Sequence, residues 1–346
     1  MVFQKQGQPL LKERQCSTDA TSSLRSAQPT LTVRVARKSV ETADICSFEL
    51  VSANGSKLPE FSAGSHIDVY LSNGITRQYS LYNSPQENHR YLIGILKDPA
   101  TRGGSRTMHE QVNEGDMLHI SSPKNHFPLV HGAQNTILLA GGIGVTPILC
   151  MAERLAIDDS TFEMHYCTRS QNRAAFLDRI LQSTFTNKLN LHFDDGAPQQ
   201  KLDISSLLDT AMPTTHIYVC GPKGFMDAVL NTAHAKGWPA SQLHYEFFSA
   251  QIDASGTDES FEIQLARSSK LFIVPKGKTV VEVLAAASID IPTSCEQGVC
   301  GTCLTRVLDG EPDHRDMYLT TEEKAANNQF LPCCSRAKST KLVLDL

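Results

Sequence analysis

The sequence predicts a multidomain chain that combines all-β and α/β domains. Short alternating strands separated by turns lie within residues 30–131, strands alternate with helices within 132–250, and a cysteine-rich loop lies within 260–346. A chain of 346 residues is also too long for one compact core. These observations together predict three domains.

The N-terminal part divides into a tail and a set of strands. Residues 1–29 are rich in Gln, Ser, Thr and Lys without periodicity, so we expect a disordered tail. Strands are predicted at 31–37, 47–51, 66–71, 77–82 and 91–96, with turn sequences such as Ser72-Asn73-Gly74 between them. Short strands at this spacing indicate an antiparallel barrel or sandwich within 30–131.

The pattern changes near Asn135. Residues 136–140 form a continuous apolar run, which is typical of a buried parallel strand. A glycine turn follows at 141–144, and we expect Thr146 as the N-cap and Pro147 as the first residue of the next helix. Further strands at 162–167, 189–193 and 216–220, and a helix at 223–233, predict an open parallel α/β sheet over 132–250.

The C-terminal part is predicted to be a separate module. Residues 251–259 are polar and contain glycine, which is typical of a linker. Within 260–346 we expect strands at 261–265 and 270–274, a helix from Thr279, and a capping box at Thr320 and Glu323.

The most informative motif is Cys295-x4-Cys300-x2-Cys303, followed far downstream by Cys333. This spacing is the thiolate pattern of a plant-type [2Fe–2S] cluster. A zinc site usually pairs two C-x2-4-C knuckles, and only one is present here. The remaining six of the ten cysteines are scattered, which favours a reducing compartment over a disulfide framework.

Composition excludes several classes of protein. A net charge of −5 argues against a nucleic-acid partner, and no apolar run approaches the length of a membrane span. The N-terminus lacks the apolar core of a secretion signal. We therefore expect a cytoplasmic monomer without a membrane partner.

Two glycine turns point to a dinucleotide. The Gly-Gly-x-Gly turn at 141–144 is weak evidence alone, because a tight packing turn has the same sequence. A second turn, Cys220-Gly221-Pro222, follows a later strand, and two such turns at strand ends mark the ligand crevice of this architecture. In the first domain, Arg77, Tyr79 and the Gly-Gly-Ser turn at 103–105 suit either phosphate binding or ordinary packing and a solvated surface.

Three motifs in fixed order carry a family resemblance. Arg-Gln-Tyr-Ser-Leu at 77–81, Gly-Gly-Ile-Gly-Val-Thr-Pro at 141–147 and Cys-Gly-Pro-Lys at 220–223 resemble the ferredoxin–NADP reductase superfamily. With the C-terminal cysteine set, the order is similar to the phthalate dioxygenase reductase family, which includes reductases of vanillate-type O-demethylases. The resemblance covers residues 30–346. It implies an antiparallel flavin-binding β-barrel, an open parallel α/β NAD-binding domain and a β-grasp [2Fe–2S] ferredoxin domain.

The resemblance also implies roles for individual residues. Residues implied to contact FMN are Arg77, Tyr79, Ser80, Leu96, Lys97, Gly103, Gly104, Ser105, Thr146 and Phe248. Residues implied to contact NAD are Gly142, Gly144, Thr168, Arg169, Ser170, Cys220, Gly221 and Pro222. Residues implied to act in catalysis are Ser80, Thr146, Cys220 and Phe248. Phe248 lies in the pattern Glu246-Phe247-Phe248-Ser249, which would place it over the flavin ring, although core packing is the alternative.

Two assignments depend on single residues. Arg169 would suit the 2′-phosphate of NADPH, whereas the resemblance favours NADH. Cys333 aligns with the fourth cluster ligand after Leu331-Pro332, and Cys334 takes a position that is usually hydrophobic, so we assign Cys333 and interpret Cys334 as packing.

These elements predict an NADH-dependent reductase. NADH would reduce FMN by hydride transfer, and single electrons would pass through the cluster to a Rieske-type oxygenase or O-demethylase. Acidic residues near the cluster suit either a docking face for a basic partner or ordinary solvated surface: Glu296, Asp309, Glu311, Asp313 and Asp316. The alternatives are a reductase of a diffusible ferredoxin or cytochrome, and a non-enzymatic electron-transfer or redox-sensing module.

Overall fold

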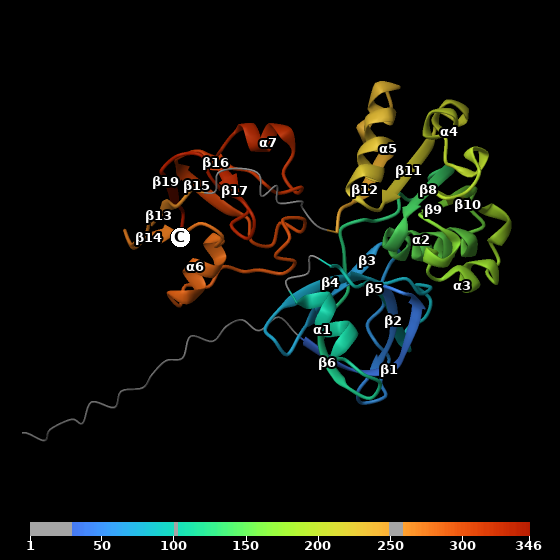
Figure 1. Cartoon of the computed structure of the whole chain (residues 1–346), viewed down its shortest axis with the longest axis horizontal. Helices are drawn as coiled ribbons and strands as arrows, with labels where there is room; N and C mark the ends of the chain where they lie inside the picture. Colours follow the sequence, from blue (N-terminus) through green and yellow to red (C-terminus); the bar gives the residue numbers. More distant parts are fainter. Residues whose placement is uncertain (1–29, 100–102, 249–258) are drawn as a thin grey trace, which may run out of the picture.

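The computed structural model describes residues 30–99, 103–248 and 259–346 (Figure 1). The predicted tail at 1–29 and all of the predicted linker except Glu259 lie outside these residues. Among the described residues, no helix is both long and apolar enough to cross a membrane.

The first domain is an antiparallel barrel with a short helix. Its sheet has the order β4-β3-β6-β1-β2-β5, with β7 paired to β3, and a bridge between Leu81 and Ile93 joins its two ends. Alternate residues of these strands, such as Val33, Val35, Ile67 and Val69, fill the interior. The elements are β1 (Thr30–Thr42), β2 (Ile45–Ser52), β3 (Ser65–Tyr70), β4 (Thr76–Ser80), β5 (Arg90–Leu96), α1 (Gly104–Glu110), β6 (Met117–Ser121) and β7 (Lys124–Asn125).

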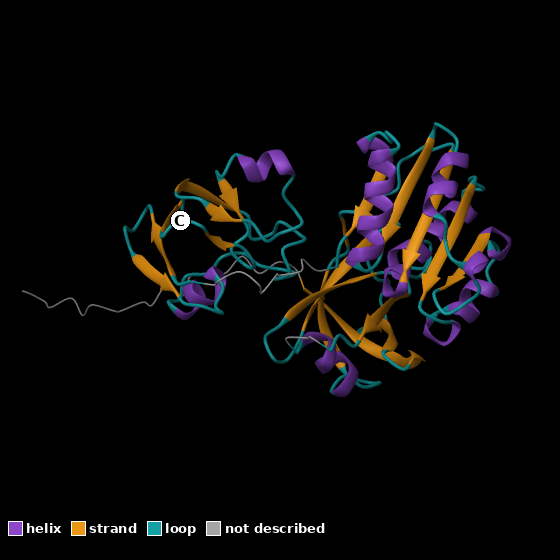
Figure 2. Ribbon diagram, turned by 45° about the horizontal axis from the view of Figure 1, so that its top comes forward, coloured by secondary structure: helices purple, strands orange, loops and turns teal. Residues whose placement is uncertain are grey.

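The second domain is an open parallel sheet with helices on both faces (Figure 2). The strand order is β10-β9-β8-β11-β12, and every neighbouring pair is parallel. The elements are β8 (Asn135–Gly141), α2 (Val145–Ile157), β9 (Phe162–Thr168), α3 (Leu177–Leu181), β10 (Leu189–Phe193), α4 (Ile204–Thr210), β11 (Thr215–Cys220), α5 (Lys223–Ala235) and β12 (Leu243–Glu246). Because helices cover both faces, β8 is buried from Thr136 to Gly141, as its apolar run predicts.

The direction of strand order reverses between β8 and β11. Successive strands run outward from β8 through β9 to β10, and then continue on the other side of β8 through β11 to β12. A ligand crevice forms at the carboxyl ends of the strands at such a switch point. The two glycine turns follow these two strands, so the topology brings both turns to this crevice.

The third domain is a small mixed sheet with the order β14-β13-β19-β15-β17, in which β13 and β19 are parallel. It forms the left-hand lobe of Figure 1 and has its own hydrophobic core. Capping boxes start both helices, at Thr279 with Glu282 and at Thr320 with Glu323. The box at Thr320 was predicted, whereas only a helix was predicted at Thr279. The elements are β13 (Phe261–Leu265), β14 (Leu271–Val274), α6 (Val280–Ala286), β15 (Thr305–Asp309), β16 (Pro312–Asp313), α7 (Thr321–Ala325), β17 (Gln329–Phe330), β18 (Arg336–Ala337) and β19 (Lys341–Leu344).

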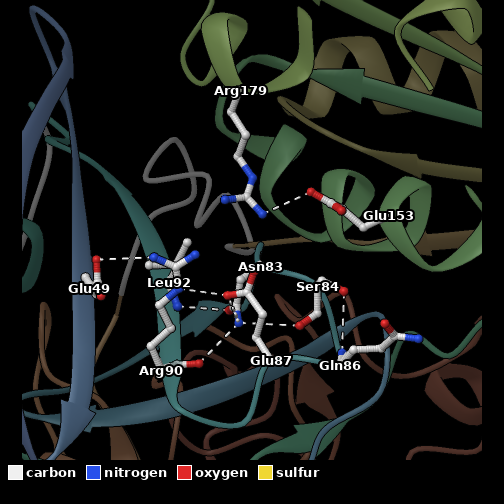
Figure 3. Close-up of polar contacts among 9 residues, drawn as sticks. All are labelled: Glu49, Asn83, Ser84, Gln86, Glu87, Arg90, Leu92, Glu153 and Arg179. Atoms are coloured by element: carbon white, nitrogen blue, oxygen red, sulfur yellow. Dashed lines mark hydrogen bonds and ion pairs between the residues drawn. The ribbon is translucent and has the colours of Figure 1, made fainter. Parts of the chain in front are cut away.

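The barrel and the α/β domain share one hydrophobic core. Tyr82 of the barrel packs against Phe176 with ring centroids 4.4 Å apart, and the guanidinium of Arg179 lies 5.7 Å from the Tyr82 ring. Figure 3 shows this seam, where Arg179 pairs with Glu153. An open cleft of about 1130 Å³ runs along the seam.

The polar groups on the barrel side of the seam bond mainly to one another. Arg90 pairs with Glu87 at 2.7 Å, and Asn83 bonds the backbone of Arg90 and Leu92 (Figure 3). These contacts fix the loop between β4 and β5. They therefore help to hold the barrel against the α/β domain.

The start of α2 differs from the prediction. The helix begins at Val145, directly after a 3-10 turn at Gly142–Gly144, so Thr146 is not its N-cap and Pro147 is not its first residue. The Thr146 hydroxyl donates instead to the carbonyl oxygen of Ile143 at 3.1 Å. Pro147 is tolerated because amide groups in the first helical turn have no partner within the helix.

Candidate active site and cluster loop

The two glycine turns of the α/β domain lie against each other. A Cβ atom on Gly144 would lie 2.2 Å from the carbonyl oxygen of Cys220, and one on Gly141 would lie 2.9 Å from Pro222. Gly142 has a φ of +51° with nothing within 4 Å of an added Cβ atom. Backbone without side chains therefore lines this part of the crevice, which suits the close approach of a pyrophosphate.

A cavity of about 650 Å³ lies where the three domains meet. This volume suits a cofactor-sized ligand. The barrel contributes Ser80 and Arg77, the end of the α/β domain contributes Phe248, and the cysteine loop contributes Cys295 and Cys300. Its other lining residues are His66, Gln78, His126, Tyr245, Glu246, Phe247, Gln297, Val299, Gly301, Thr302, Met317 and Tyr318. The site thus joins residues implied for the flavin to residues implied for the cluster.

Glu246 is a cavity residue to which the sequence reasoning gave no role. The Ser80 hydroxyl donates to its Oε2 at 3.3 Å. Burial raises the pKa of Glu246 from 4.5 to about 7, and the Ser80 hydrogen bond only partly opposes this effect. Glu246 also contributes to raising the pKa of Cys220, after burial, which is the main cause. The Glu246-x-Phe248 pattern contained the signal for this residue.

Phe248, predicted to cover the flavin, lies at the cavity and is 38% exposed. Tyr245 at 48% exposure and Phe247 line the same cavity. An aromatic ring with one open face can pack against a flat ligand. Ser249 of the same pattern lies outside the described residues.

Arg77 lies over the Gly-Gly turn at the start of α1. A Cβ atom on Gly104 would lie 2.7 Å from Cγ and Nε of Arg77, so only glycine leaves room for this side chain. Gly103 has a φ of +110°, which glycine adopts without strain. The hydroxyl of Tyr79 is enclosed and has no hydrogen-bond partner among the described residues, although the rest of the side chain is half-buried.

Four further residues implied for FMN lie around the barrel without lining the cavity. Lys97 is exposed and pairs with Glu110 at 2.9 Å, and Leu96 ends β5. The Ser105 hydroxyl accepts a hydrogen bond from the Asp98 amide at 3.2 Å. Thr146 is buried behind β5, close to Gly94.

The residues implied for adenosine follow β9. The Thr168 hydroxyl donates to the Ser170 carbonyl oxygen at 2.9 Å, while Arg169 is exposed. The amides of Asp194 and Asp195 donate to the carbonyl oxygens of Thr168 and Arg169. Two exposed carboxylates therefore follow the neighbouring strand beside Arg169.

The four predicted cluster ligands lie as two pairs of buried thiols. Cys295 and Cys300 are hydrogen-bonded, which raises the pKa of Cys295 and lowers that of Cys300 to about 5. Cys303 bonds Cys333 in the same way, and this bond raises the pKa of Cys303. A [2Fe–2S] cluster takes two protein ligands on each iron, so two pairs fit its needs. Within the described residues, no three His, Cys, Asp or Glu side chains converge as the ligands of a single metal ion.

Cys334 has a different environment from Cys333. Its Sγ lies 3.7 Å from the Leu331 carbonyl oxygen and 3.8 Å from the Ser335 hydroxyl. It also contacts Cys333, and this bond raises its pKa. Cys333 is therefore the residue of the Cys-Cys pair that reaches Cys303.

The cysteine loop also touches the barrel through residues that the sequence reasoning missed. Ser294, next to Cys295, donates to the buried carboxylate of Asp68 at 2.7 Å. Gln78 donates to both of these residues. Nearby, burial and His126 lower the pKa of His66 to about 4, and the Nδ1 of His66 has no partner among the described residues.

The suggested acidic docking face loses one member, Asp316, because that residue is buried, whereas Asp309 and Glu311 are exposed. Asp316 is 2% exposed and accepts hydrogen bonds from the amides of Tyr318 and Leu319, so it is structural. The other paired carboxylates are Glu296 with Arg77, Glu311 with Lys338 and Asp313 with Arg315. Arg315 is a sequence neighbour of Asp313, whereas Arg77 and Lys338 come from other parts of the chain.

Comparisons with known proteins agree with this geometry. Residues 263–338 match the 2Fe-2S iron-sulfur cluster binding domain, and residues 138–231 match the oxidoreductase NAD-binding domain. The chain is 53% identical to the vanillate O-demethylase oxidoreductase of Pseudomonas sp. (strain HR199 / DSM 7063), over 88% of this chain and 96% of that protein. It is 40% identical to the phthalate dioxygenase reductase of Burkholderia cepacia, over 91% of this chain and 97% of that protein. The chain belongs to the phthalate dioxygenase reductase family.

A solved structure supports the same assignment. The structure of phthalate dioxygenase reductase, described as modular for electron transfer from pyridine nucleotides to [2Fe-2S], matches with a TM-score of 0.78 and 39% identity. The match covers 92% of this chain and 98% of that chain. The predicted three-domain fold, the NADH-dependent reductase activity and the cofactor set of FMN, NADH and [2Fe–2S] are confirmed. An oxygenase as electron acceptor is confirmed as well.

Proposed function

We propose that this phthalate dioxygenase reductase family member supplies electrons from NADH to a Rieske-type O-demethylase of a methoxylated aromatic acid. The observation that carries the proposal is the 650 Å³ cavity, which Ser80, Phe248, Cys295 and Cys300 line together. A ligand in this cavity lies against the cysteine loop, so electrons need to travel only a short path. The demethylase assignment is supported by identities of 49–54% to three vanillate O-demethylase oxidoreductases, against 40% to phthalate dioxygenase reductase.

The barrel residues are proposed to bind FMN. Arg77 and the turn at Gly103, Gly104 and Ser105 would hold the phosphate, because a cation lies over a turn without side chains. Tyr79, Leu96, Lys97 and Thr146 would complete the surroundings of the flavin. When bound, FMN supplies the conversion of a two-electron donor to one-electron transfer.

Ser80 and Glu246 are proposed to control protons at the cavity. Ser80 can donate to one acceptor at a time, and in the described contacts it donates to Glu246. With a pKa of about 7, Glu246 changes its charge near neutral pH, where an ordinary glutamate is already ionised. Cys220 and Phe248 would confine the nicotinamide end, and Phe248 would leave the ring when NADH enters.

The glycine turns are proposed to hold the dinucleotide, with Gly142, Gly144, Gly221 and Pro222 against the pyrophosphate. Thr168, Arg169 and Ser170 would contact the adenosine. We propose that Asp194 and Asp195 explain the preference for NADH, because they lie beside Arg169 and disfavour a 2′-phosphate.

Cys295, Cys300, Cys303 and Cys333 are the proposed cluster ligands. A plant-type cluster has a reduction potential of about −400 mV, which is lower than that of Rieske centres. Electron transfer from the cluster to a Rieske centre is therefore downhill. A monomeric state and a cytoplasmic location stay predictions from the sequence.

Reconstitution tests the proposal. Purified protein should show flavin and iron–sulfur absorption that NADH bleaches, and it should support cytochrome c reduction. Mixed with the oxygenase component of a vanillate O-demethylase, it should drive NADH-dependent formaldehyde release from vanillate. A protein that bleaches with NADH but reduces only a free ferredoxin, and neither this oxygenase nor that of phthalate dioxygenase, would contradict the proposed partner.

A further inference from the structure

A polar contact joins the cluster loop to the barrel beside the first cysteine. The Ser294 hydroxyl donates to Oδ1 of Asp68 at 2.7 Å. The amide Nε2 of Gln78 donates to the same Oδ1 at 2.9 Å and to the Ser294 hydroxyl at 3.0 Å. Lys124 holds the other oxygen of Asp68 at 2.7 Å. The residues come from β3, β4, β7 and the cluster loop, and Asp68 and Ser294 lie 226 positions apart in the sequence.

The groups in this contact are buried, and both oxygens of the Asp68 carboxylate accept hydrogen bonds. Asp68 is 1% exposed and Ser294 is 4% exposed. Burial acts to raise the pKa of Asp68, but the hydrogen bonds from Lys124, Ser294 and Gln78 together outweigh it and lower the pKa. A buried carboxylate that loses one of its partners is strongly disfavoured. Displacement of the loop would break such a bond, so the contact favours one position of the loop on the barrel.

The residue on the other side of Cys295 also binds the barrel. Glu296 lies 3.5 Å from the guanidinium of Arg77. Both neighbours of Cys295 are therefore attached to strands of the barrel. Cys295 and Cys300 in turn line the cavity together with Ser80, whereas Cys303 and Cys333 do not line it. The attachment thus decides which pair of thiols faces the cavity.

We propose that Asp68 and Ser294 form a latch that positions the cluster loop on the barrel and sets the rate of electron transfer from flavin to cluster. The inference rests on the proposed cofactor sites. One hydride from NADH carries two electrons, and the cluster accepts one at a time, so each NADH supports two one-electron reductions of the cluster. The partner oxidises the cluster between them. Asp68 and Ser294 are positioning residues, because the contacts that support the latch join them to each other and to the barrel.

The latch predicts a selective kinetic effect. In anaerobic stopped-flow mixing of the holoenzyme with NADH, flavin bleaching should keep its rate within about twofold in Ser294→Ala, because the nicotinamide side is untouched. Cluster reduction should slow by about tenfold or more, as small displacements of reacting groups do elsewhere. Ser294→Thr keeps the hydroxyl and should restore most of the rate. Asp209→Asn removes a charge from an exposed ion pair with Lys236, outside the latch. It is the control, and it should leave the rate of cluster reduction unchanged.

A structural readout accompanies the kinetics. Small-angle X-ray scattering of oxidised holoenzyme should give a larger radius of gyration for Ser294→Ala and Asp68→Ala than for wild type. If Ser294→Ala loses the cluster, the rate of cluster reduction is measured in Asp68→Ala instead, because Asp68 lies on the barrel and not in the cluster loop. An unchanged cluster-reduction rate with an intact cluster, or equal slowing in Ser294→Ala and Ser294→Thr, would overturn the latch. Failure of wild type to reduce its cluster with NADH would instead overturn the proposed function, and the scattering comparison would still test the latch.

Discussion

The Ser80 hydroxyl at the end of β4 donates a hydrogen bond to Oε2 of Glu246 at the end of β12, with the two oxygens 3.3 Å apart. The residues are 166 positions apart and belong to different domains. This bond links the barrel to the α/β domain at the cavity. Within the part of the chain that the structure describes, Ser80 is the side-chain hydrogen-bond partner of the half-buried Glu246.

We expect Glu246 to make stability depend on pH. Burial raises its folded pKa to about 7, whereas the unfolded chain ionises it near 4.5, so the folded state binds the extra proton between these values. Stability should therefore fall as pH rises from about 4.5 to 7 and then level off. Glu246→Gln should remove this contribution and raise the unfolding midpoint at pH 8 relative to wild type. Thermal unfolding from pH 5 to pH 8 checks this, and equal pH dependence in both proteins would contradict it.

The two adjacent cysteines should behave differently when substituted. Cys333 reaches Cys303, whereas Cys334 faces the Leu331 carbonyl and the Ser335 hydroxyl. Cys333→Ser should abolish the visible spectrum of the cluster, because the cluster needs four thiolates. Cys334→Ser should retain it, with a modest loss of stability from placing a hydroxyl in a buried site. Iron content and absorbance measure both, and the reverse pattern would make Cys334 the ligand.

Gly144 should not tolerate a side chain. Its Cβ would lie 2.2 Å from the Cys220 carbonyl oxygen, so the two turns of the crevice would have to separate. Gly144→Ala should cost about 1–3 kcal/mol of stability and raise the KM for NADH. Gly224→Ala is a matched control in the same region, since an added Cβ there meets nothing within 4 Å. The control should be neutral or stabilising by up to about 1 kcal/mol.

Much of this architecture could be predicted because its signals are local. Alternation in β1 and β3, the apolar run of β8 and the cysteine spacing each reflect a period or turn within a few residues. The capping boxes of α6 and α7 are local in the same sense. The predicted start of α2 was wrong because a 3-10 turn at Gly142–Gly144 leads directly into the helix. The Thr-Pro signal alone does not reveal this earlier start.

The contacts between domains could not be predicted in this way. Asp68 reads as an ordinary polar position in an alternating strand, and only the folded chain places it against Ser294. Glu246 ends the four-residue edge strand β12, which has little apolar periodicity and depends on pairing with β11. Asp316 was wrongly included in the suggested acidic face for the same reason, because its burial arises from packing that the local sequence does not show.

The cluster loop provides a test of packing around the cysteines. Gly301 has a φ of +72°, and its Cβ would lie 2.2 Å from the ring of Tyr318. Gly301→Ala should therefore lower cluster content and the stability of the third domain. Adding Tyr318→Ala should remove the steric part of the defect and leave about 1–2 kcal/mol from the left-handed backbone. Absorbance and thermal unfolding of the two single variants and the double variant check this, and additive defects would show that the two residues do not interact.

The choice of nucleotide should respond to the acidic residues after β10. Asp194 and Asp195 are exposed next to the backbone of Arg169, so a 2′-phosphate near that arginine would also meet two carboxylates. Asp195→Asn should shift the ratio of kcat/KM for NADH and NADPH toward NADPH by about tenfold, which corresponds to about 1.4 kcal/mol of binding free energy. Arg169→Ala should lower activity with NADPH and leave activity with NADH nearly unchanged, since ribose hydroxyls do not need a cation. Steady-state kinetics with both nucleotides decide this. An equal loss with NADH and NADPH in Arg169→Ala would mean that the arginine binds a group that both nucleotides share, and that the carboxylates, rather than the arginine, determine the preference.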